Sequence, residues 1–275
     1  MSSRDFEIEL QLLLDAIYLK YHYDFRSYAH ASLKRRLKSA MTQLGCRTLS
    51  QVQDRIVHDP SAFTAVLGFL TVPVTEMFRD PLYFLALREQ VVPVLRTYPS
   101  LKIWVAGCST GEEAYSLAIL LREEQLLDRA IIYATDINSQ TLQQAEAGVY
   151  ESDRIAGFTE NHRKSGARTS LSDYYTARYG RAVFDKSLRK NIVFSDHSLA
   201  TDSVFAEVQL VSCRNVLIYF NRDLQERALG LFKDALCRKG FLGLGAKESL
   251  RFSMYADAFV EIAPGDRIYQ KDEAA

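Results

Sequence analysis

The 275-residue sequence lacks any run of about 18 uninterrupted apolar residues, the length that a membrane-spanning helix needs. Its start, MSSRDFEIEL, is acidic and has no apolar segment of the kind that marks a secretory signal peptide. The four cysteines form no Cys-x-x-Cys pair, so we expect free thiols in a reducing cytoplasm. The five histidines show no metal-ligand spacing, and we predict no metal. The sequence therefore predicts a cytoplasmic protein that is not inserted in a membrane.

Net charge is absent as well, because 34 Lys and Arg balance 34 Asp and Glu. A neutral chain is not typical of proteins whose main task is to coat nucleic acid. Hydrophobic residues make up 48% and charged residues 25%, which is an ordinary globular composition and excludes a disordered or collagen-like chain. The length predicts roughly two domains, large enough to fold without disulfides or metals.

Residues 1–90 are predicted to form a helical domain. Apolar residues recur at helical spacing from Phe6 to Tyr18. Ser27 is a candidate cap for a second helix whose apolar face runs through residues 33–44, and Gly45 is predicted to end it. Two further helices are expected at residues 49–57 and 61–70.

Residues 91–275 show a different pattern, in which short apolar strands alternate with helices. Such alternation predicts an α/β fold with a doubly wound parallel sheet. A turn at Pro264-Gly265-Asp266 predicts a terminal antiparallel hairpin over residues 258–270, and the polar, Tyr-rich residues 150–190 are predicted to be a small inserted subdomain. The expected strands are residues 101–106, 130–136, 191–194, 208–212 and 240–245, and the expected helices are residues 112–124, 139–147 and 222–238.

The strongest local signal is a strand, a loop of small residues and a helix over residues 104–113, WVAGCSTGEE. Gly107 and Gly111 would let the backbone approach a ligand closely, at the carboxyl end of the strand where α/β sheets bind ligands. A dinucleotide site would need a third glycine and a positive helix start. Glu112 and Glu113 stand there instead and would repel a phosphate.

Those two acids suit a ligand that carries positive charge and no phosphate. S-adenosylmethionine (SAM) has a sulfonium and an ammonium group and meets both conditions. Asp136 ends the second strand, where an acid commonly accepts hydrogen bonds from ribose hydroxyls. The alternative is an ordinary tight turn with Asp136 capping the helix that follows Asn138.

Residues 26–47 carry six basic residues and no acid. On a helical wheel the apolar residues of this segment group together, and Lys34, Arg35 and Lys38 spread over the opposite side. This face, with Arg36, is predicted to dock on an acidic partner helix, and the alternative is a solvated face. We expect no nucleic-acid binding, because no convincing helix-turn-helix signature is present.

Four motifs carry a resemblance to a known family: residues 75–80 (TEMFRD), 106–116 (AGCSTGEEAYS), 134–138 (ATDIN) and 213–220 (CRNVLIYF). Together they resemble the chemoreceptor glutamate methyltransferases of the CheR type, over nearly the whole chain. The resemblance implies a helical receptor-docking domain followed by a SAM-dependent methyltransferase domain with a small three-stranded antiparallel subdomain. It also implies transfer of a methyl group from SAM to chemoreceptor glutamates, which forms methyl esters and S-adenosylhomocysteine (SAH).

The resemblance also assigns site residues. Glu113 would meet the methionyl end of SAM and Asp136 the ribose, while Ser198 and Pro73 stand where the family usually has asparagine. Arg79 would also orient the substrate carboxylate, and Tyr219 would give it a second hydrogen bond. The full set of cofactor-binding residues is predicted to be Thr75, Arg79, Gly107, Glu113, Asp136, Ser198, Leu199, Asn215 and Val216.

The chemistry needs no general base, because a glutamate carboxylate with a pKa of about 4.3 is already ionised at pH 7. Two structural alternatives stand beside the catalytic ones: Arg79 as a surface residue before a helix capped by Asp80, and Tyr219 as a packed aromatic. Two functions compete with this one: a SAM-dependent methyltransferase that acts on another acceptor, and a receptor-binding adaptor that is not an enzyme. A nucleic-acid N-methylase is disfavoured, because no Asn/Asp-Pro-Pro-aromatic motif occurs. We expect a monomer.

Overall fold

The computed structural model describes residues 3–71 and 75–272, so Pro73 lies outside the described residues. The chain divides into two compact units, each of which is described by itself. The helical unit contains the chain up to Pro73 together with residues 198–202 and 219–227, and the sheet unit contains residues 74–197, 203–218 and 228–275. Among the helices of the described residues, none is both long and apolar enough to cross a membrane.

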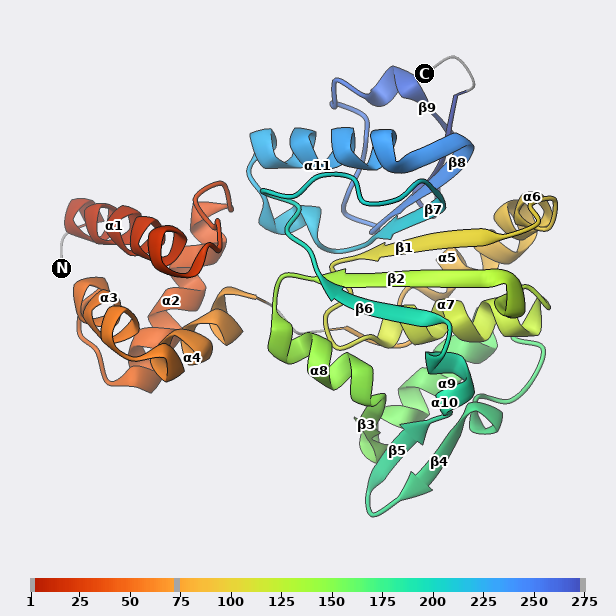
Figure 1. The fold of residues 1–275 in the computed structure, drawn as a ribbon, viewed down its shortest axis with the longest axis horizontal. Coiled ribbons are helices and arrows are strands. Elements are labelled where there is room, and N and C mark those ends of the chain that lie inside the picture. The colour runs from red at the N-terminus through yellow and green to blue at the C-terminus, as the bar shows by residue number, and fades with distance from the viewer. Residues whose placement is uncertain (1–2, 72–74, 273–275) are drawn as a thin grey trace. The chain divides into compact units, whose positions relative to one another are not determined.

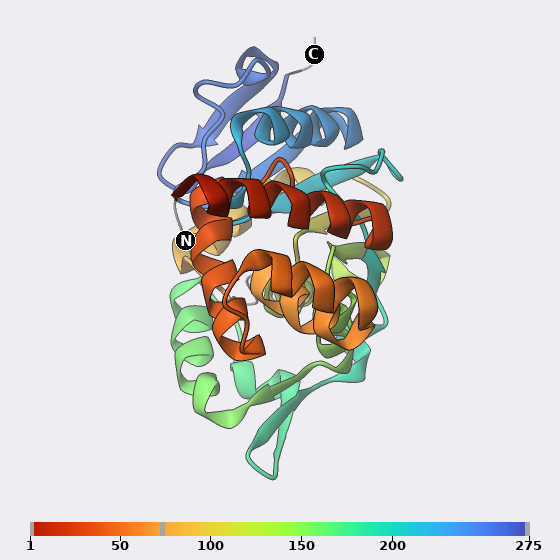
Figure 2. The same ribbon diagram turned by 90° about the vertical axis from the view of Figure 1, so that its left-hand side faces the viewer.

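The helical unit is built on four helices, α1 Ser3–Tyr21, α2 His30–Leu44, α3 Leu49–His58 and α4 Pro60–Leu70 (Figure 2). Thr48 and Asp59 cap α3 and α4 by accepting hydrogen bonds from backbone amides of the first turn. Gly45 ends α2 in the left-handed conformation, as predicted. The fully buried core of the unit consists of Leu13, Leu14, Ile17, Phe25, Leu33, Leu37, Ala40, Leu49, Val52, Ile56, Val66 and Leu70.

The prediction that Ser27 caps the second helix is wrong. Helix α2 begins at His30, with Ala29 in the capping position and no side-chain cap. The backbone around Ser27 is engaged elsewhere, because its carbonyl accepts a 2.9 Å hydrogen bond from the Asn221 amide.

The sheet unit contains a seven-stranded sheet in the order β6-β2-β1-β7-β8-β10-β9 (Figure 1). The first five strands in this order run parallel, and β10 and β9 add the predicted antiparallel hairpin at one edge. The strands are β1 Leu101–Ala106, β2 Ala130–Asp136, β6 Ile192–Asp196, β7 Val208–Cys213, β8 Leu236–Leu244, β9 Phe259–Ala263 and β10 Ile268–Lys271.

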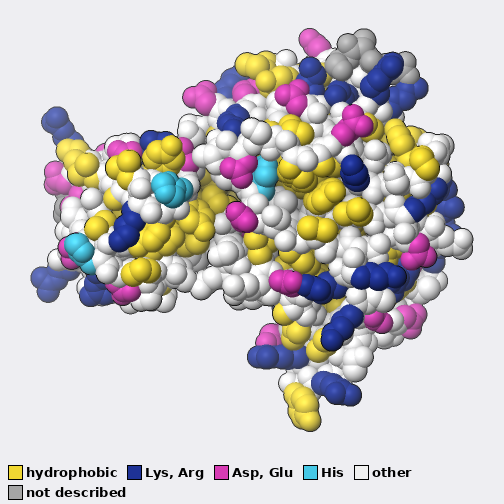
Figure 3. Space-filling view, viewed as in Figure 1, with side chains coloured by type: hydrophobic (Ala, Val, Ile, Leu, Met, Phe, Trp, Pro, Cys, Tyr) yellow, Lys and Arg dark blue, Asp and Glu magenta, His cyan; other side chains and the backbone are white. Residues whose placement is uncertain are grey.

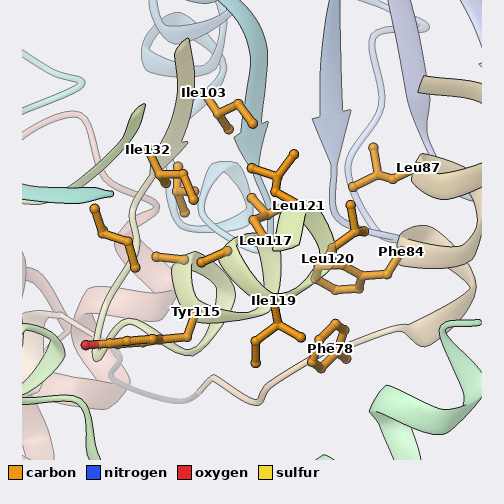
Figure 4. Close-up of a cluster of buried hydrophobic side chains, with 14 of the residues drawn as sticks. Phe78, Phe84, Leu87, Ile103, Tyr115, Leu117, Ile119, Leu120, Leu121 and Ile132 are labelled. Atoms are coloured by element: carbon orange, nitrogen blue, oxygen red, sulfur yellow. The ribbon is translucent and has the colours of Figure 1, made fainter. Parts of the chain in front are cut away.

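Helices cover the two faces of the sheet unequally. Helices α7 Glu112–Glu123 and α8 Ser139–Ala147 lie on one side, and α11 Arg222–Ala235 lies on the other (Figure 1). Alternate residues of a strand point to opposite faces. Ile103 therefore meets the α7 side (Figure 4), whereas the ring of Trp104 packs 5.4 Å from that of Phe232 in α11.

No helix is assigned to the described crossover between β6 and β7, residues 197–207. Its Phe205 instead lies over the sheet, with ring centroids 5.0 Å from Trp104 and 5.3 Å from Tyr133. Hydrophobic side chains show at the surface over β2 and β6 (Figure 3), where Ile131, Val193 and Phe205 are 42%, 47% and 44% exposed. The sheet is thus doubly wound with one crossover left without a helix.

The boundary between the units lies near residue 73, whereas the sequence placed it near residue 90. The segment after the boundary forms α5 Pro81–Ala86, the π-helical turn η1 Leu87–Val91 and α6 Val92–Leu95. Phe78, Phe84 and Leu87 are buried in the same hydrophobic cluster as the sheet and α7 (Figure 4). Helical periodicity identified these residues as helix, and only packing shows which core they join.

The inserted subdomain is a three-stranded antiparallel sheet in the order β3-β5-β4, as the fold class predicted. It comprises β3 Val149–Glu151, β4 Tyr175–Arg178 and β5 Arg181–Phe184 with helices α9 Ile155–Lys164 and α10 Lys186–Arg189. Tyr150, Phe158 and Phe184 tie it to the hydrophobic cluster of the large sheet. Short 3-10 turns occupy Leu127–Arg129, Ser152–Arg154, Leu171–Tyr174, Leu217–Tyr219 and Ala256–Ala258.

Candidate active site

The loop after β1 needs glycine for the packing of the protein itself. Gly107 and Gly111 have φ angles of 76° and 93°, in the left-handed region. A Cβ at Gly107 would lie 2.4 Å from a methyl carbon of Val216, and one at Gly111 would lie 2.8 Å from Cβ of Ala145. The sequence analysis assigned these glycines to ligand approach, and the structure shows that neighbouring segments already require them.

Asp136 ends β2 beside that loop. Its Oδ2 accepts a 2.8 Å hydrogen bond from the Ser109 amide, and its Oδ1 accepts a 2.9 Å bond from the Asn138 amide. Burial raises the pKa of the Asp136 carboxyl, although these amides favour its ionised form. An ionised carboxylate is an acceptor only, which is the property that binding of ribose hydroxyls requires.

The two acids at the start of α7 have different surroundings. Glu112 is fully buried and accepts hydrogen bonds from Thr110 Oγ1 at 2.6 Å and from Arg154 at 2.7 Å. Burial raises the pKa of the Glu112 carboxyl. Glu113 is 12% exposed and accepts a 2.6 Å hydrogen bond from Ser212 Oγ. Glu112 is therefore a packing residue, and Glu113 is the acid that remains partly open at the sheet edge.

Arg214, which the sequence analysis did not single out, connects Glu113 to the segment that contains Arg79. Its side chain is 1% exposed, with Nη1 3.2 Å from Glu113 Oε2 and Nη2 2.7 Å from Asp80 Oδ2. Its guanidinium carbon lies 4.1 Å from the ring centroid of Tyr83, a cation–π contact. An arginine directly after a buried apolar strand, in CRN at residues 213–215, was the available signal.

Separate elements hold the segment 75–80, which carries Arg79. The carbonyl of Thr75 accepts from Arg154, and the carbonyl of Met77 accepts a 3.1 Å hydrogen bond from Asn161. The amide of Phe78 donates to Ser116 Oγ at 2.8 Å. Both neighbours of Arg79 have left-handed backbones, with φ angles of 51° at Phe78 and 55° at Asp80. Asp80 stands at the N-cap position of α5, as the alternative expected, but its side chain makes no capping hydrogen bond.

A buried carboxylate shapes the loop that carries Asn215 and Val216. Glu248 is 4% exposed and accepts hydrogen bonds from the amides of Gly245 at 2.7 Å and Asn215 at 2.9 Å. Burial raises the pKa of the Glu248 carboxyl. Asn215 itself has a left-handed φ of 62°. Glu248 is 33 residues away along the chain, and no sequence pattern pointed to it.

The structure thus gathers seven predicted residues in the sheet unit, at the carboxyl ends of β1, β2 and β7 and on the segment 75–80. They are Thr75, Arg79, Gly107, Glu113, Asp136, Asn215 and Val216. Ser198, Leu199 and Tyr219 belong to the helical unit. There the ring of Tyr219 lies 4.9 Å from the Arg36 guanidinium carbon, and its carbonyl accepts a 2.8 Å hydrogen bond from the Ala29 amide.

One predicted docking residue is misplaced by the sequence analysis. Arg36 is 9% exposed, donates to the carbonyl of Leu70 and lies 2.7 Å from Ser32 Oγ, so it is not a surface charge. Arg35 and Lys38 are exposed, and Lys34 is partly buried in an ion pair with Glu7. The docking prediction included Arg36 with the other basic residues of this helix, whereas its side chain reaches the Leu70 carbonyl at the end of α4.

The site fits SAM by its unmatched polar atoms as well as by Asp136 and Glu113. Ser109 Oγ, Arg214 Nε and Asn215 Oδ1 are buried without a hydrogen-bond partner in the described structure. Buried polar atoms are normally paired, so a polar ligand at this edge is expected to satisfy such groups. The acids at the α7 start disfavour a phosphate there, as the sequence indicated.

Replacing Asp136 with alanine is expected to weaken SAH binding by roughly 1.5–3 kcal/mol, the value of hydrogen bonds to a charged group. Because the pKa of the Asp136 carboxyl is raised, SAH affinity is also expected to depend on pH. Above that pKa the ionised carboxylate accepts from the ribose, and below it this acceptor is lost, so wild-type affinity should fall on acidification earlier than an ordinary aspartate would allow. Calorimetry across a pH series measures both effects. Asp136→Asn should show a flatter pH profile, and identical profiles would remove Asp136 from the site.

Comparison with known proteins agrees with the site. The family profile described as "CheR methyltransferase, SAM binding domain" matches residues 73–262, and the one described as "CheR methyltransferase, all-alpha domain" matches residues 8–71. A Pseudomonas putida protein named "Putative methyltransferase Cher3" is 59% identical over 98% of this chain and 99% of its own length. A "Chemotaxis protein methyltransferase" of Listeria innocua is 31% identical over 82% of this chain and 84% of its own length. With a SAM-compatible edge on a doubly wound sheet and both profiles matched in order, the chain belongs to the CheR family of SAM-dependent methyltransferases.

Proposed function

We propose that the protein methylates glutamate side chains in the cytoplasmic signalling domain of chemoreceptors, forming glutamate methyl esters in chemosensory adaptation. The observation that carries this proposal is the held position of Arg79. Thr75, Met77 and Phe78 are bound through their backbones to three different elements, and Arg79 follows them directly. A planar guanidinium on this segment suits a carboxylate acceptor.

The residues of the chain align the reactants and move no proton. Bound SAM supplies an electrophilic methyl group on its sulfonium. Asp136 and Glu113 bind the ribose and the methionyl end, and Arg79 orients the acceptor carboxylate. Alignment of this kind can lower a barrier by about 7–11 kcal/mol.

Helix α2 is proposed to dock the acidic methylation region of the receptor through Arg35 and Lys38. Both side chains are exposed, whereas Arg36 is buried and Lys34 is paired with Glu7. The other side of α2 is apolar and packs into the core of the helical unit through Leu33, Leu37 and Ala40. Arg35 and Lys38 lie on the solvent side of the helix, although the Lys38 ammonium also lies 6.0 Å from the ring centroid of the buried Phe6.

Reversing both charges, in Arg35→Glu/Lys38→Glu, should raise the KM for receptor roughly 5- to 30-fold, since two reversed surface pairs change binding by about 1–2 kcal/mol. SAH affinity should stay as in wild type. The wild-type KM should also rise with salt, because exposed charges are screened over about 8 Å at physiological ionic strength. Lys102→Glu/Lys190→Glu, which reverses two exposed lysines of the sheet unit, is the matched control. A wild-type KM in Arg35→Glu/Lys38→Glu would show that these charges only face solvent and do not dock the receptor.

The function itself is tested by supplying tritiated SAM and receptor-containing membranes. The expected product is label on the receptor that mild base releases, because a carboxyl methyl ester is base-labile and an N-methyl group is not. Base-stable label, or label only on other molecules, would replace the glutamate assignment with another acceptor.

A further inference from the structure

A cleft of about 520 Å³ lies beside the candidate active site, within the sheet unit. Asp80, Leu82, Arg214, Leu244, Ala246 and Asp266 contribute to its walls. They come from the start of α5, the loops that follow β7 and β8, and the turn between β9 and β10. The lining is largely apolar, and Leu82 is 61% exposed.

The cleft lies on the β8 side of the sheet edge, next to the cofactor residues that follow β7. Gly107 follows β1 and Asp136 ends β2, whereas the cleft residue Leu244 ends β8 and Ala246 follows it. In doubly wound sheets the strand order reverses at one point, here between β1 and β7, and ligands bind at the carboxyl ends around it. A second reactant is therefore expected over β7 and β8.

Arg214 belongs to both halves of this edge. Its Nη1 lies 3.2 Å from Glu113 on the cofactor side, and its Nη2 lies 2.7 Å from Asp80 in the cleft wall. Its Nε is buried without a partner among the described residues. A carboxylate that enters the cleft would therefore reach a guanidinium next to the cofactor end of the site.

Asp80 already places a carboxylate on that guanidinium. Its side chain is 46% exposed, makes no cap to α5 and extends from a left-handed backbone with a φ of 55°. Neither helix capping nor core packing accounts for this acid, and the contact with Arg214 does. Glu113 already neutralises Arg214, and Asp80 gives Nη2 of the buried guanidinium a hydrogen-bonding partner when no acceptor is present.

We infer that this cleft is the entrance for the acceptor segment and that Asp80 stands in for the acceptor carboxylate on Arg214 until the target glutamate replaces it. The inference rests on the proposed glutamate methylation and names how that substrate is selected. A glutamine side chain carries no charge and cannot displace Asp80 from the arginine. The apolar wall around Leu82 would take an uncharged side chain that neighbours the target glutamate.

The first test varies the charge of the cleft. Asp80→Asn removes the competing carboxylate and should lower the KM for receptor about fivefold or more, the size of one strong surface charge interaction. Asp266→Asn is the matched control, because it removes the same charge from the same cleft and leaves the Asp80–Arg214 pair intact. It should change KM less than about twofold. An unchanged or raised KM in Asp80→Asn would overturn the stand-in role, because an acid that only held Arg214 in place would weaken acceptor binding when removed.

The second test fills the cleft. Ala246 is exposed and lines the cleft, so Ala246→Trp should raise the KM for receptor roughly tenfold or more by steric exclusion. Lys247→Trp, an exposed neighbour outside the cleft lining, is its control. SAH affinity, measured by calorimetry, should stay within about twofold in Ala246→Trp and Lys247→Trp, because neither residue contacts Arg214, the ribose residue or the methionyl residue. A wild-type KM in Ala246→Trp overturns the entrance.

The two levels of the proposal fail in different ways. Absence of base-labile label with the wild-type protein would refute the proposed function. Base-labile label with wild-type values for Asp80→Asn and Ala246→Trp would refute only the role of the cleft. If urea unfolding shows that one of these variants is not folded, the other variant is sufficient for the test, because Asp80 and Ala246 come from different segments of the cleft lining.

Discussion

Arg79→Ala is expected to lower the single-turnover rate of methyl transfer by about 10²-fold or more, in line with the losses that 1 Å misplacement of a reactant causes. The segment around Arg79 is held by side chains of Arg154, Asn161 and Ser116, which bind its backbone. Removal of the guanidinium should therefore keep these three backbone contacts while it removes the group proposed to orient the acceptor. SAH affinity should change much less than the rate.

Arg79→Lys separates charge from geometry. An ammonium keeps the charge and lacks the planar fork that matches a carboxylate, so it should restore little of the rate. The rate of the wild-type protein should be flat from about pH 6 to 8, since neither an ionised glutamate nor an arginine titrates there. Rapid quench with tritiated SAM gives the rates. Near wild-type turnover in Arg79→Ala would leave Arg79 as a structural residue, and a bell-shaped profile would indicate a titrating catalytic group instead.

The second large effect is expected at Arg214. Arg214→Met should lower the free energy of unfolding by about 3–5 kcal/mol, because removal of one partner of a buried ion pair leaves an uncompensated charge. Glu113 is that charge, since it is only 12% exposed and receives Nη1 of Arg214. Methionine fills much of the same volume against Tyr83, so the loss measures charge more than packing.

Urea unfolding at constant m-value measures this loss. A double variant, Arg214→Met/Glu113→Gln, should recover part of the stability, because it removes the unpaired carboxylate as well. SAH affinity should be below that of wild type in both variants. Arg214→Met removes the guanidinium that binds Glu113, and the double variant replaces Glu113 itself. If Arg214→Met is as stable as wild type, solvent alone stabilises the Glu113 carboxylate.

The sequence predicted the sheet unit with good accuracy where the pattern was local. The strands at residues 101–106 and 130–136 and the helix at residues 139–147 match β1, β2 and α8 in full. Where turn residues bound a short apolar run, the two ends of the strand can be predicted from the sequence. The last helix was predicted too long. Helix α11 ends at Ala235 and β8 begins at Leu236, which pairs with Val208 of β7, so the sheet takes residues that a helical pattern also fits.

The candidate site was predicted through motifs and only in part. Residues in the four motifs could be assigned by resemblance, and Asp136 also by its place at a strand end. Arg154, Glu248 and Asp80 could not, because their roles depend on partners far away in the sequence: Arg154 reaches Glu112 and Thr75, and Glu248 reaches the Asn215 amide. The burial of Arg36 could not be predicted either, because its hydrogen-bond acceptor is the Leu70 carbonyl in α4.

The sequence by itself determined the fold class, the SAM-binding edge and the family, because periodicity, small-residue loops and motif order are local properties of the chain. The tertiary structure alone decided which core residues 75–95 join, which basic residues of α2 face solvent, and that Arg214 connects Glu113 to Asp80. The physical reason is the same in each case. Burial and ion pairing depend on distances between segments remote in the sequence, and those distances exist only once the chain has packed.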